Sequence, residues 1–101
     1  MKVISKHKTK IYTEDGVTRI KYHNTDVIEF NKVYIKLNSN GWQTATTKTR
    51  MNQAASQFNL NFNVYQKDFT WYISYFGHEI EYHDNIILDR LNKSKHEFSN
   101  N

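Results

Sequence analysis

The chain has 101 residues, the length of one domain. Its 14 lysines and arginines against 10 aspartates and glutamates give a net charge of +4 and an isoelectric point near 9.3, which excludes an acidic mimic of DNA and permits an anionic partner. The absence of cysteine excludes disulfides and thiolate chemistry, and no apolar run approaches the roughly 20 residues that cross a bilayer, so we expect no membrane partner.

The first third of the sequence shows the two-residue periodicity of β-strands. Asp15-Gly16 is the strongest turn signal, because both residues tolerate the left-handed conformation of a tight hairpin. Asn31-Lys32 indicates a second turn. Together these signals predict strands over residues 3–12, 17–23, 26–30 and 33–37.

A helix is predicted after the loop at residues 38–41. Apolar residues recur at i, i+3, i+4 and i+7, which makes a narrow stripe typical of a helix packed closely on a sheet. The stripe consists of Met51, Ala54, Ala55 and Phe58. We expect a hydroxyl of Thr44 or Thr46 to cap the start of the helix and Asn59 to end it.

Three further strands are predicted, over residues 60–65, 69–75 and 80–82, followed by an apolar run at residues 86–88. This order predicts an α+β domain over residues 1–91, with about seven mostly antiparallel strands, four before and three after a single helix. Because one helix cannot cover seven strands, we expect a curved sheet or partial barrel packed on the helix, or a face left for a partner. The polar segment 92–101 is expected to fray.

The start of the predicted helix carries positive charge where a helix favours negative charge. Free backbone N–H groups bind phosphate or carboxylate readily at such a point. The pattern predicts a phosphate site formed by Thr46, Thr47, Lys48 and Arg50, with Trp42 as a flat stacking surface. The alternative is that the threonines only cap the helix, the cations lie in solvent and the tryptophan packs in the core. The glycine spacing of a P-loop is absent.

A basic strand face is the second candidate site. Positive side chains alternate along the first two predicted strands, and if these strands pair they form a ribbon that can follow a phosphate backbone. The residues are Lys6, Lys8 and Lys10 on the first strand and Arg19, Lys21 and His23 on the second. Tyr34, Tyr65 and Tyr72 alternate with core positions and are candidates for stacking on bases. The alternative is an ordinary solvated face in which lysine stems cover the tyrosines.

No pattern in the sequence indicates catalysis, a metal site or a cofactor. The five histidines lack the spacing of metal ligands. Asp26 and Glu29, followed by Lys32, faintly resemble the acid-and-lysine sets of metal-dependent nucleases. However, two residues three positions apart point to opposite faces of a regular strand, which argues against a shared metal. We therefore expect a protein that is not an enzyme.

Two stretches resemble a group of small uncharacterised proteins encoded by tailed bacteriophages: HNTDVIEF, residues 23–30, and IKLNSNGWQTATTKTRMNQAASQFNLNFNVYQKDFTWYI, residues 35–73. The similar part runs from about residue 23 to residue 82. Its recurrent elements are Gly41-Trp42, the segment 46–53 and the aromatic segment 64–73. The resemblance implies a viral origin and a location in the cytoplasm of an infected bacterium, and it implies no mechanism.

These observations together predict a small phage accessory protein that binds a phosphate-bearing ligand, with nucleic acid as the first choice. The helix start would hold a phosphate, and Arg19 and Lys21 would extend the positive surface. Two alternatives stay open. One is a protein that binds and inhibits a host defence, replication or transcription factor. The other is a sponge for a nucleotide signal, for which Trp42 is the only stacking residue near the helix start.

Overall fold

The structure of the protein, a computed structural model, describes residues 7–91. The predicted frayed segment 92–101 lies outside the described residues, as do Lys6, His96 and the first part of the strand predicted over residues 3–12. In the described part, four strands precede one helix and four strands follow it.

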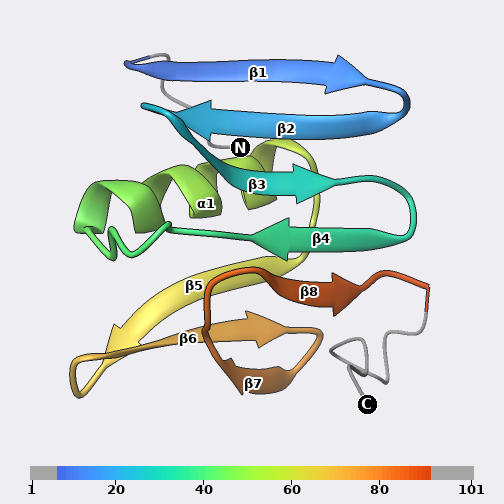
Figure 1. Cartoon of the computed structure of the whole chain (residues 1–101). Helices are drawn as coiled ribbons and strands as arrows, with labels where there is room; N and C mark the ends of the chain where they lie inside the picture. Colours follow the sequence, from blue (N-terminus) through green and yellow to red (C-terminus); the bar gives the residue numbers. More distant parts are fainter. Residues whose placement is uncertain (1–6, 92–101) are drawn as a thin grey trace.

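Five strands form one antiparallel sheet in the order β1-β2-β3-β4-β8 (Figure 1). They are β1 (Thr9–Glu14), β2 (Val17–Tyr22), β3 (Thr25–Phe30), β4 (Tyr34–Leu37) and β8 (Ile86–Asp89). The first four follow one another through short turns, as the sequence predicts. Asp15 and Gly16 have positive φ angles of 53° and 78°, so the predicted two-residue hairpin turn is confirmed.

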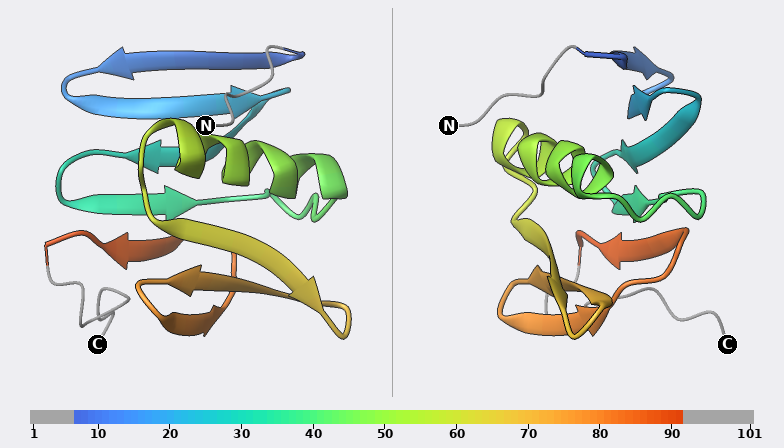
Figure 2. Two further views of the ribbon diagram at one scale, coloured as in Figure 1. Left: turned by 180° about the vertical axis from the view of Figure 1, so that it is seen from behind. Right: turned by 90° about the vertical axis from the view of Figure 1, so that its left-hand side faces the viewer.

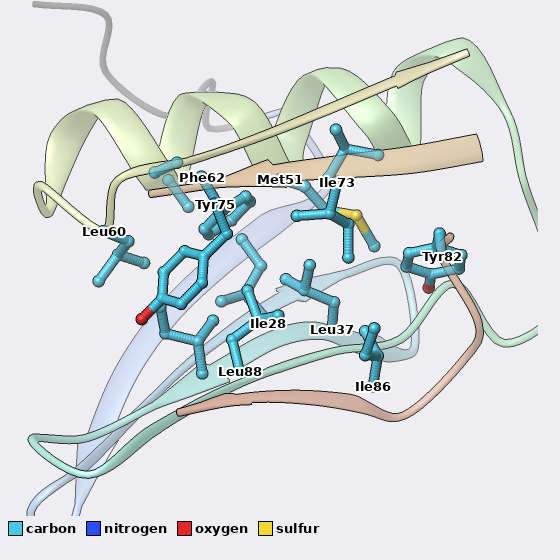
Figure 3. Packing of buried hydrophobic residues seen from close by; sticks show 14 of the residues in the cluster. Ile28, Leu37, Met51, Leu60, Phe62, Ile73, Tyr75, Tyr82, Ile86 and Leu88 are labelled. Atoms are coloured by element: carbon cyan, nitrogen blue, oxygen red, sulfur yellow. The ribbon is translucent and has the colours of Figure 1, made fainter. Parts of the chain in front are cut away.

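A helix and a second sheet lie on the same side of the first sheet (Figure 2). The helix, α1 (Ala45–Gln57), contacts β2, β3 and β5. The second sheet is antiparallel and consists of β5 (Phe62–Lys67), β6 (Thr70–Tyr75) and β7 (His78–Glu81). The apolar core fills the space between these layers (Figure 3) and includes Ile28 and Leu37 from the first sheet, Met51 from the helix and Ile73 from the second sheet.

The helix begins and ends where the sequence predicts. Thr44 caps its start, because the Thr44 Oγ1 atom accepts a hydrogen bond from the Thr47 N–H at 3.1 Å. Asn59 follows its end with a φ angle of 53°, the left-handed conformation common after helices. The Asn52 amide pairs with the edge of β5 like an extra strand residue: it donates to the Val64 carbonyl at 2.8 Å and accepts from the Val64 N–H at 2.7 Å.

The α+β class is confirmed, but the number and grouping of the strands differ from the prediction. The apolar run at residues 86–88 is part of β8, which pairs with β4 across a long stretch of sequence and makes the described strands eight rather than seven. Within residues 7–91 the strands form two open sheets rather than one curved sheet or a partial barrel. Phe69, predicted to begin a strand, lies instead in a turn with Asp68; their φ angles are 67° and 52°.

Candidate nucleic-acid interface

Lys48 and Arg50 leave α1 in different directions. Residues two positions apart lie about 200° apart around an α-helix, and the contacts of the two side chains follow this geometry. The Lys48 Nζ atom lies 6.0 Å from the centroid of the Trp71 ring on β6, whereas Arg50 reaches the hairpin of β1 and β2. The structure therefore does not bring these two predicted phosphate ligands together.

Arg50 is engaged inside the protein, with only 7% of its surface exposed. Its Nε donates to Thr9 Oγ1 at 3.1 Å and its Nη1 to Gln53 Oε1 at 3.4 Å. The guanidinium carbon lies 5.2 Å from the centroid of the Tyr22 ring, which is a cation–π contact. Among residues 7–91, no carboxylate pairs with Lys48 or Arg50. The arginine holds the helix against the first two strands, and little of it is open to a ligand.

The threonines at the helix start differ in exposure. Thr47 is 2% exposed, and its Oγ1 accepts a hydrogen bond from the Thr44 hydroxyl at 3.1 Å. Thr46 lies on the exposed side of the first helical turn. Thr44 therefore has the capping role that the alternative interpretation gave to the threonines. Thr47 is buried behind Thr44, and Thr46 lies on the surface.

The register of β1 and β2 confirms that the two basic strands pair. Lys10 lies opposite Lys21, and Tyr12 lies opposite Arg19, so these four side chains share the face of the sheet that is turned away from the core. Arg19 Nε pairs with Glu29 Oε1 on β3 at 3.0 Å, which balances its charge. Neither Lys10 nor Lys21 forms an ion pair within the described part of the chain. Asp26 lies opposite Lys21 on this face, and its carboxylate accepts a hydrogen bond from the Tyr12 hydroxyl at 2.9 Å. The face therefore carries two lysines without ion pairs and a carboxylate beside one of them.

A β-bulge between β2 and β3 places Asp26 and Glu29 on the same face. The residues opposite them are Lys21 and Arg19, which are two positions apart and share a face. The prediction of opposite faces is wrong because it assumed a regular strand. Partial burial raises the pKa of Glu29, but hydrogen bonds from Tyr34 and Arg19 outweigh this effect and hold the pKa below its ordinary value. Within residues 7–91, no group of three histidines or carboxylates is placed to hold a metal ion.

Asp84 organises the loop that presents Trp42. Its carboxylate accepts four hydrogen bonds of 2.6–2.9 Å, from the Ser39 N–H and hydroxyl, the Gly41 N–H and the Tyr82 hydroxyl. Gly41 has a φ angle of 79°, a conformation that favours glycine. Partial burial raises the pKa of Asp84, but these hydrogen bonds outweigh it and the pKa lies below its ordinary value. The braced loop leaves Trp42 69% exposed.

Three adjoining pockets form one groove beside the Trp42 side chain. The first, of about 150 Å³, lies between Tyr22, Trp42 and the start of α1. The second shares His23, Thr25 and Trp42 with the first, and the third shares His23 with the second. No carboxylate lines these three pockets. We call this surface the basic groove, formed by Lys8, Lys10, Lys21, His23, Thr25 and Trp42. A fourth pocket shares Asn24, Thr25 and Asn40 with the second, and it is lined by Asp26, Glu29 and Lys36.

The arrangement of the strands explains why these residues meet. The start of β1, the turn from β2 to β3 and the loop before α1 all lie at the same side of the molecule (Figure 1).

The family model described as Kyanoviridae Gp96 protein matches residues 1–100 of the chain. The chain belongs to this phage protein family. The viral origin implied by the two similar stretches is confirmed, and the similarity covers nearly the whole chain.

No curated protein and no solved structure matches this member of the Gp96 family. The one helix among residues 7–91 lacks the length and apolar character needed to cross a membrane.

The outer face of the second sheet fits nucleic acid less well than the basic groove does. In this member of the family, the rings of Tyr65 and Tyr72 stack with their centroids 5.9 Å apart, on the face that the alternation predicts. The Tyr65 hydroxyl donates to Glu79, and this hydrogen bond raises the pKa of Tyr65 to about 12. Glu81 lies opposite Tyr72. Lys67 pairs with Glu79 at 3.5 Å, whereas Glu81 forms no ion pair within residues 7–91. The negative charge of Glu81 beside Tyr72 repels a phosphate backbone.

Sequence reasoning identified some residues of the groove and missed others. Lys10 and Lys21 belong to the predicted basic ribbon, and alternation along paired strands was sufficient to find them. Lys8 and His23 were predicted on the same strands but lie in turns just outside them, with φ angles of 51° and 56°. Thr25 was missed because it begins a short strand without a chemical signature. The bracing role of Asp84 was missed because its partners in the loop, Ser39 and Gly41, lie 45 and 43 positions earlier, and no local pattern connects them.

Proposed function

We propose that this phage protein binds nucleic acid through the basic groove and acts as a non-catalytic accessory protein in the cytoplasm of the infected bacterium. One observation carries the proposal. Lys8, Lys10 and Lys21 line a surface that adjoins the exposed Trp42 ring, and none of the three forms an ion pair within residues 7–91. The carboxylates of the adjoining pocket, Asp26 and Glu29, accept hydrogen bonds from Tyr12 and from Arg19 and Tyr34. A row of cations without ion pairs next to an aromatic ring is an arrangement that can bind phosphates and bases together.

The predicted site residues take different parts in this proposal. Lys21 and Trp42 lie in the groove, and Thr46 lies at the exposed start of α1. Arg19 extends the same strand face, although Glu29 balances its charge. The contacts of Arg50 assign it to holding the groove together, because it bonds to Thr9 and packs on Tyr22, which both line the pockets.

The proposal is tested by measuring the affinity of the Lys10→Ala/Lys21→Ala double variant for a labelled oligonucleotide by fluorescence anisotropy at several salt concentrations. Each lost phosphate contact lowers the slope of log K against log salt by roughly 0.7–0.9, so we expect a slope lower by about 1.5 and weaker binding at low salt. The matched control is Lys32→Ala/Lys67→Ala, which removes the same charge from residues that line none of these pockets. If the first variant keeps the affinity and slope of the wild type, the proposal fails.

The Lys48→Ala variant distinguishes the basic groove from the helix start, which the sequence predicts as the phosphate site. Lys48 lies against Trp71, away from the groove, so the proposal expects its replacement to behave like the control. A loss of affinity as large as that of the Lys10→Ala/Lys21→Ala variant would assign the phosphate to the helix start instead.

Binding of a host protein is the second candidate function, and Phe69 favours it. The side chain is 95% exposed at the tip of the hairpin of β5 and β6. Its φ angle of 67° is costly for a residue other than glycine. An aromatic ring displayed at that cost is a candidate anchor for a partner. A host protein retained from nuclease-treated lysate by the wild type and lost with Phe69→Gly would support this function.

A further inference from the structure

The first pocket of the basic groove has the size and lining of a site for one planar ring. Its volume of about 150 Å³ is well below the roughly 300–1,000 Å³ of pockets that enclose drug-sized ligands. Three aromatic or imidazole rings contribute to its walls, those of Tyr22, His23 and Trp42. Hydroxyl groups of Thr25, Thr44 and Thr47 and of Ser39 supply the polar part of the lining.

Two of these hydroxyls have hydrogen-bonding capacity left over. Within residues 7–91 the Thr25 hydroxyl makes no hydrogen bond. Thr47 Oγ1 accepts from the Thr44 hydroxyl, and the described residues provide no acceptor for its own proton. Both threonines line the pocket, but Thr47 is only 2% exposed. The Thr25 hydroxyl is on a partly exposed residue, so it offers a donor and an acceptor to the edge of a ring that enters the pocket. Rings for stacking and short polar groups for an edge are what recognition of an unstacked base requires.

The pocket connects directly to the lysines. His23, Thr25 and Trp42 line both the first and second pockets, and His23 and Asn24 line both the second and third. A strand with one base in the first pocket can pass over the turn from β2 to β3 and place its phosphates beside Lys10 and Lys21 on the outer face of the sheet. In a duplex each base is paired and stacked, so its Watson–Crick edge and both ring faces are covered. Only an unpaired base can enter without the cost of being flipped out.

We propose that the basic groove selects single-stranded nucleic acid by receiving one unpaired base between the Trp42 ring and the Thr25 hydroxyl. This inference rests on the proposed function and adds the substrate class. Trp42 needs no rearrangement for this role, because its ring is already 69% exposed and the loop that carries it is held by Asp84. The lysines bind the backbone of any nucleic acid, and the pocket supplies the preference for an unpaired strand.

The experiment compares a labelled single strand with the same sequence annealed to its complement, for the wild type, Trp42→Ala and Lys10→Ala/Lys21→Ala. We expect the wild type to bind the single strand more tightly than the duplex. Loss of one stacked base weakens binding roughly 5- to 150-fold, so Trp42→Ala should lower single-strand affinity by a factor in that range and leave duplex affinity unchanged. Trp42→Phe, which keeps a flat ring, should retain most of the preference.

The outcomes separate this inference from the function on which it rests. If Trp42→Ala changes neither affinity, or lowers both by the same factor, while the lysine variant weakens both, the base pocket is refuted and nucleic-acid binding stands. If the lysine variant has no effect, the proposed function itself falls. A free nucleoside monophosphate that binds as tightly as the strand would replace the single-strand inference with a nucleotide-binding site. Circular dichroism of each variant verifies that the fold is kept.

Discussion

Replacing Asp84 by asparagine tests whether one carboxylate holds the loop that presents Trp42. The asparagine has the same size but no charge, and only one of its two polar atoms can accept a hydrogen bond. With its oxygen placed at the former Oδ1, it can still accept from Ser39 and Tyr82. Its NH₂ group then faces the Gly41 N–H, and two donors cannot bond to each other.

The size of the effect follows from these contacts. The hydrogen bond from Gly41 is lost, and a hydrogen bond to a charged group contributes roughly 1.5–3 kcal/mol. The three remaining bonds become neutral, which reduces each to roughly half its strength. Two effects recover part of this loss: water can bond to the N–H of the exposed Gly41, and the neutral asparagine lacks the desolvation cost of a partly buried charge. We expect Asp84→Asn to lower the free energy of unfolding by about 2–4 kcal/mol, a large part of the roughly 5–15 kcal/mol typical of a domain.

Urea unfolding followed by circular dichroism measures this difference, with Asp15→Asn as the matched control. Asp15 lies in an exposed turn that accepts asparagine equally well, so the control should stay within about 0.5 kcal/mol of the wild type. Because the folded-state pKa of Asp84 is lowered, its contribution is complete above the unfolded-state pKa of about 3.9 and is lost as the pH falls through the folded-state pKa. The difference between wild type and Asp84→Asn should therefore shrink below about pH 4. If Asp84→Asn unfolds like Asp15→Asn at neutral pH, the carboxylate does not brace the loop.

Three further predictions concern the second sheet and its contact with the helix. Asn52→Ala leaves a backbone N–H and C=O of β5 without partners, so urea unfolding should show a loss of about 2–4 kcal/mol, whereas Asn63→Ala on the exposed face of β5 should cost less than about 0.5 kcal/mol. Phe69→Gly removes left-handed strain from a side chain that buries almost nothing and should raise stability by about 1 kcal/mol in the same assay; a loss would mean that the ring holds the hairpin. Glu79→Ala removes the hydrogen-bond acceptor and the charge that raise the pKa of Tyr65 to about 12, so NMR titration of that ring should show its pKa falling toward 10, and an unchanged pKa would contradict the assigned hydrogen bond.

Local signals were sufficient for much of the fold. The Asp15-Gly16 turn sets the register of β1 and β2, because a two-residue loop allows only one pairing of the flanking strands. That register in turn places Lys10 opposite Lys21, so the basic face was predictable from the turn and the alternation alone. The apolar spacing around Met51 located the helix and its buried side.

The features that sequence reasoning missed depend on contacts between distant segments. The strand β8 has only four residues, and the helix and the whole second sheet separate it from its partner β4 along the sequence. No periodicity distinguishes such a run from a loop. The bulge beside Asp26 is equally hidden, because it follows from the pairing of β3 with β2 rather than from the residues of β3 alone. The different directions of Lys48 and Arg50 follow from helix geometry, but the rings that they contact, those of Trp71 and Tyr22, lie far from them in the sequence.

The positive charge at the start of α1, which first suggested a phosphate site, has a different physical explanation. Arg50 is the sixth residue of the helix, and the effect of the helix dipole is confined to the first turn. A guanidinium is weakly hydrated and planar, so it can be buried against the face of Tyr22 and satisfied by Thr9 at a smaller cost than an ammonium group. Its charge nevertheless has no carboxylate partner among residues 7–91, and buried charges are screened less by salt than exposed ones. Tyr22 and Thr9 line the basic groove, and Arg50 lies behind them. Arg50 therefore adds to the positive potential that Lys10 and Lys21 produce at the groove. Arg50 therefore holds the helix against β1 and β2, and its positive potential also favours an anion in the groove although Arg50 does not contact that anion.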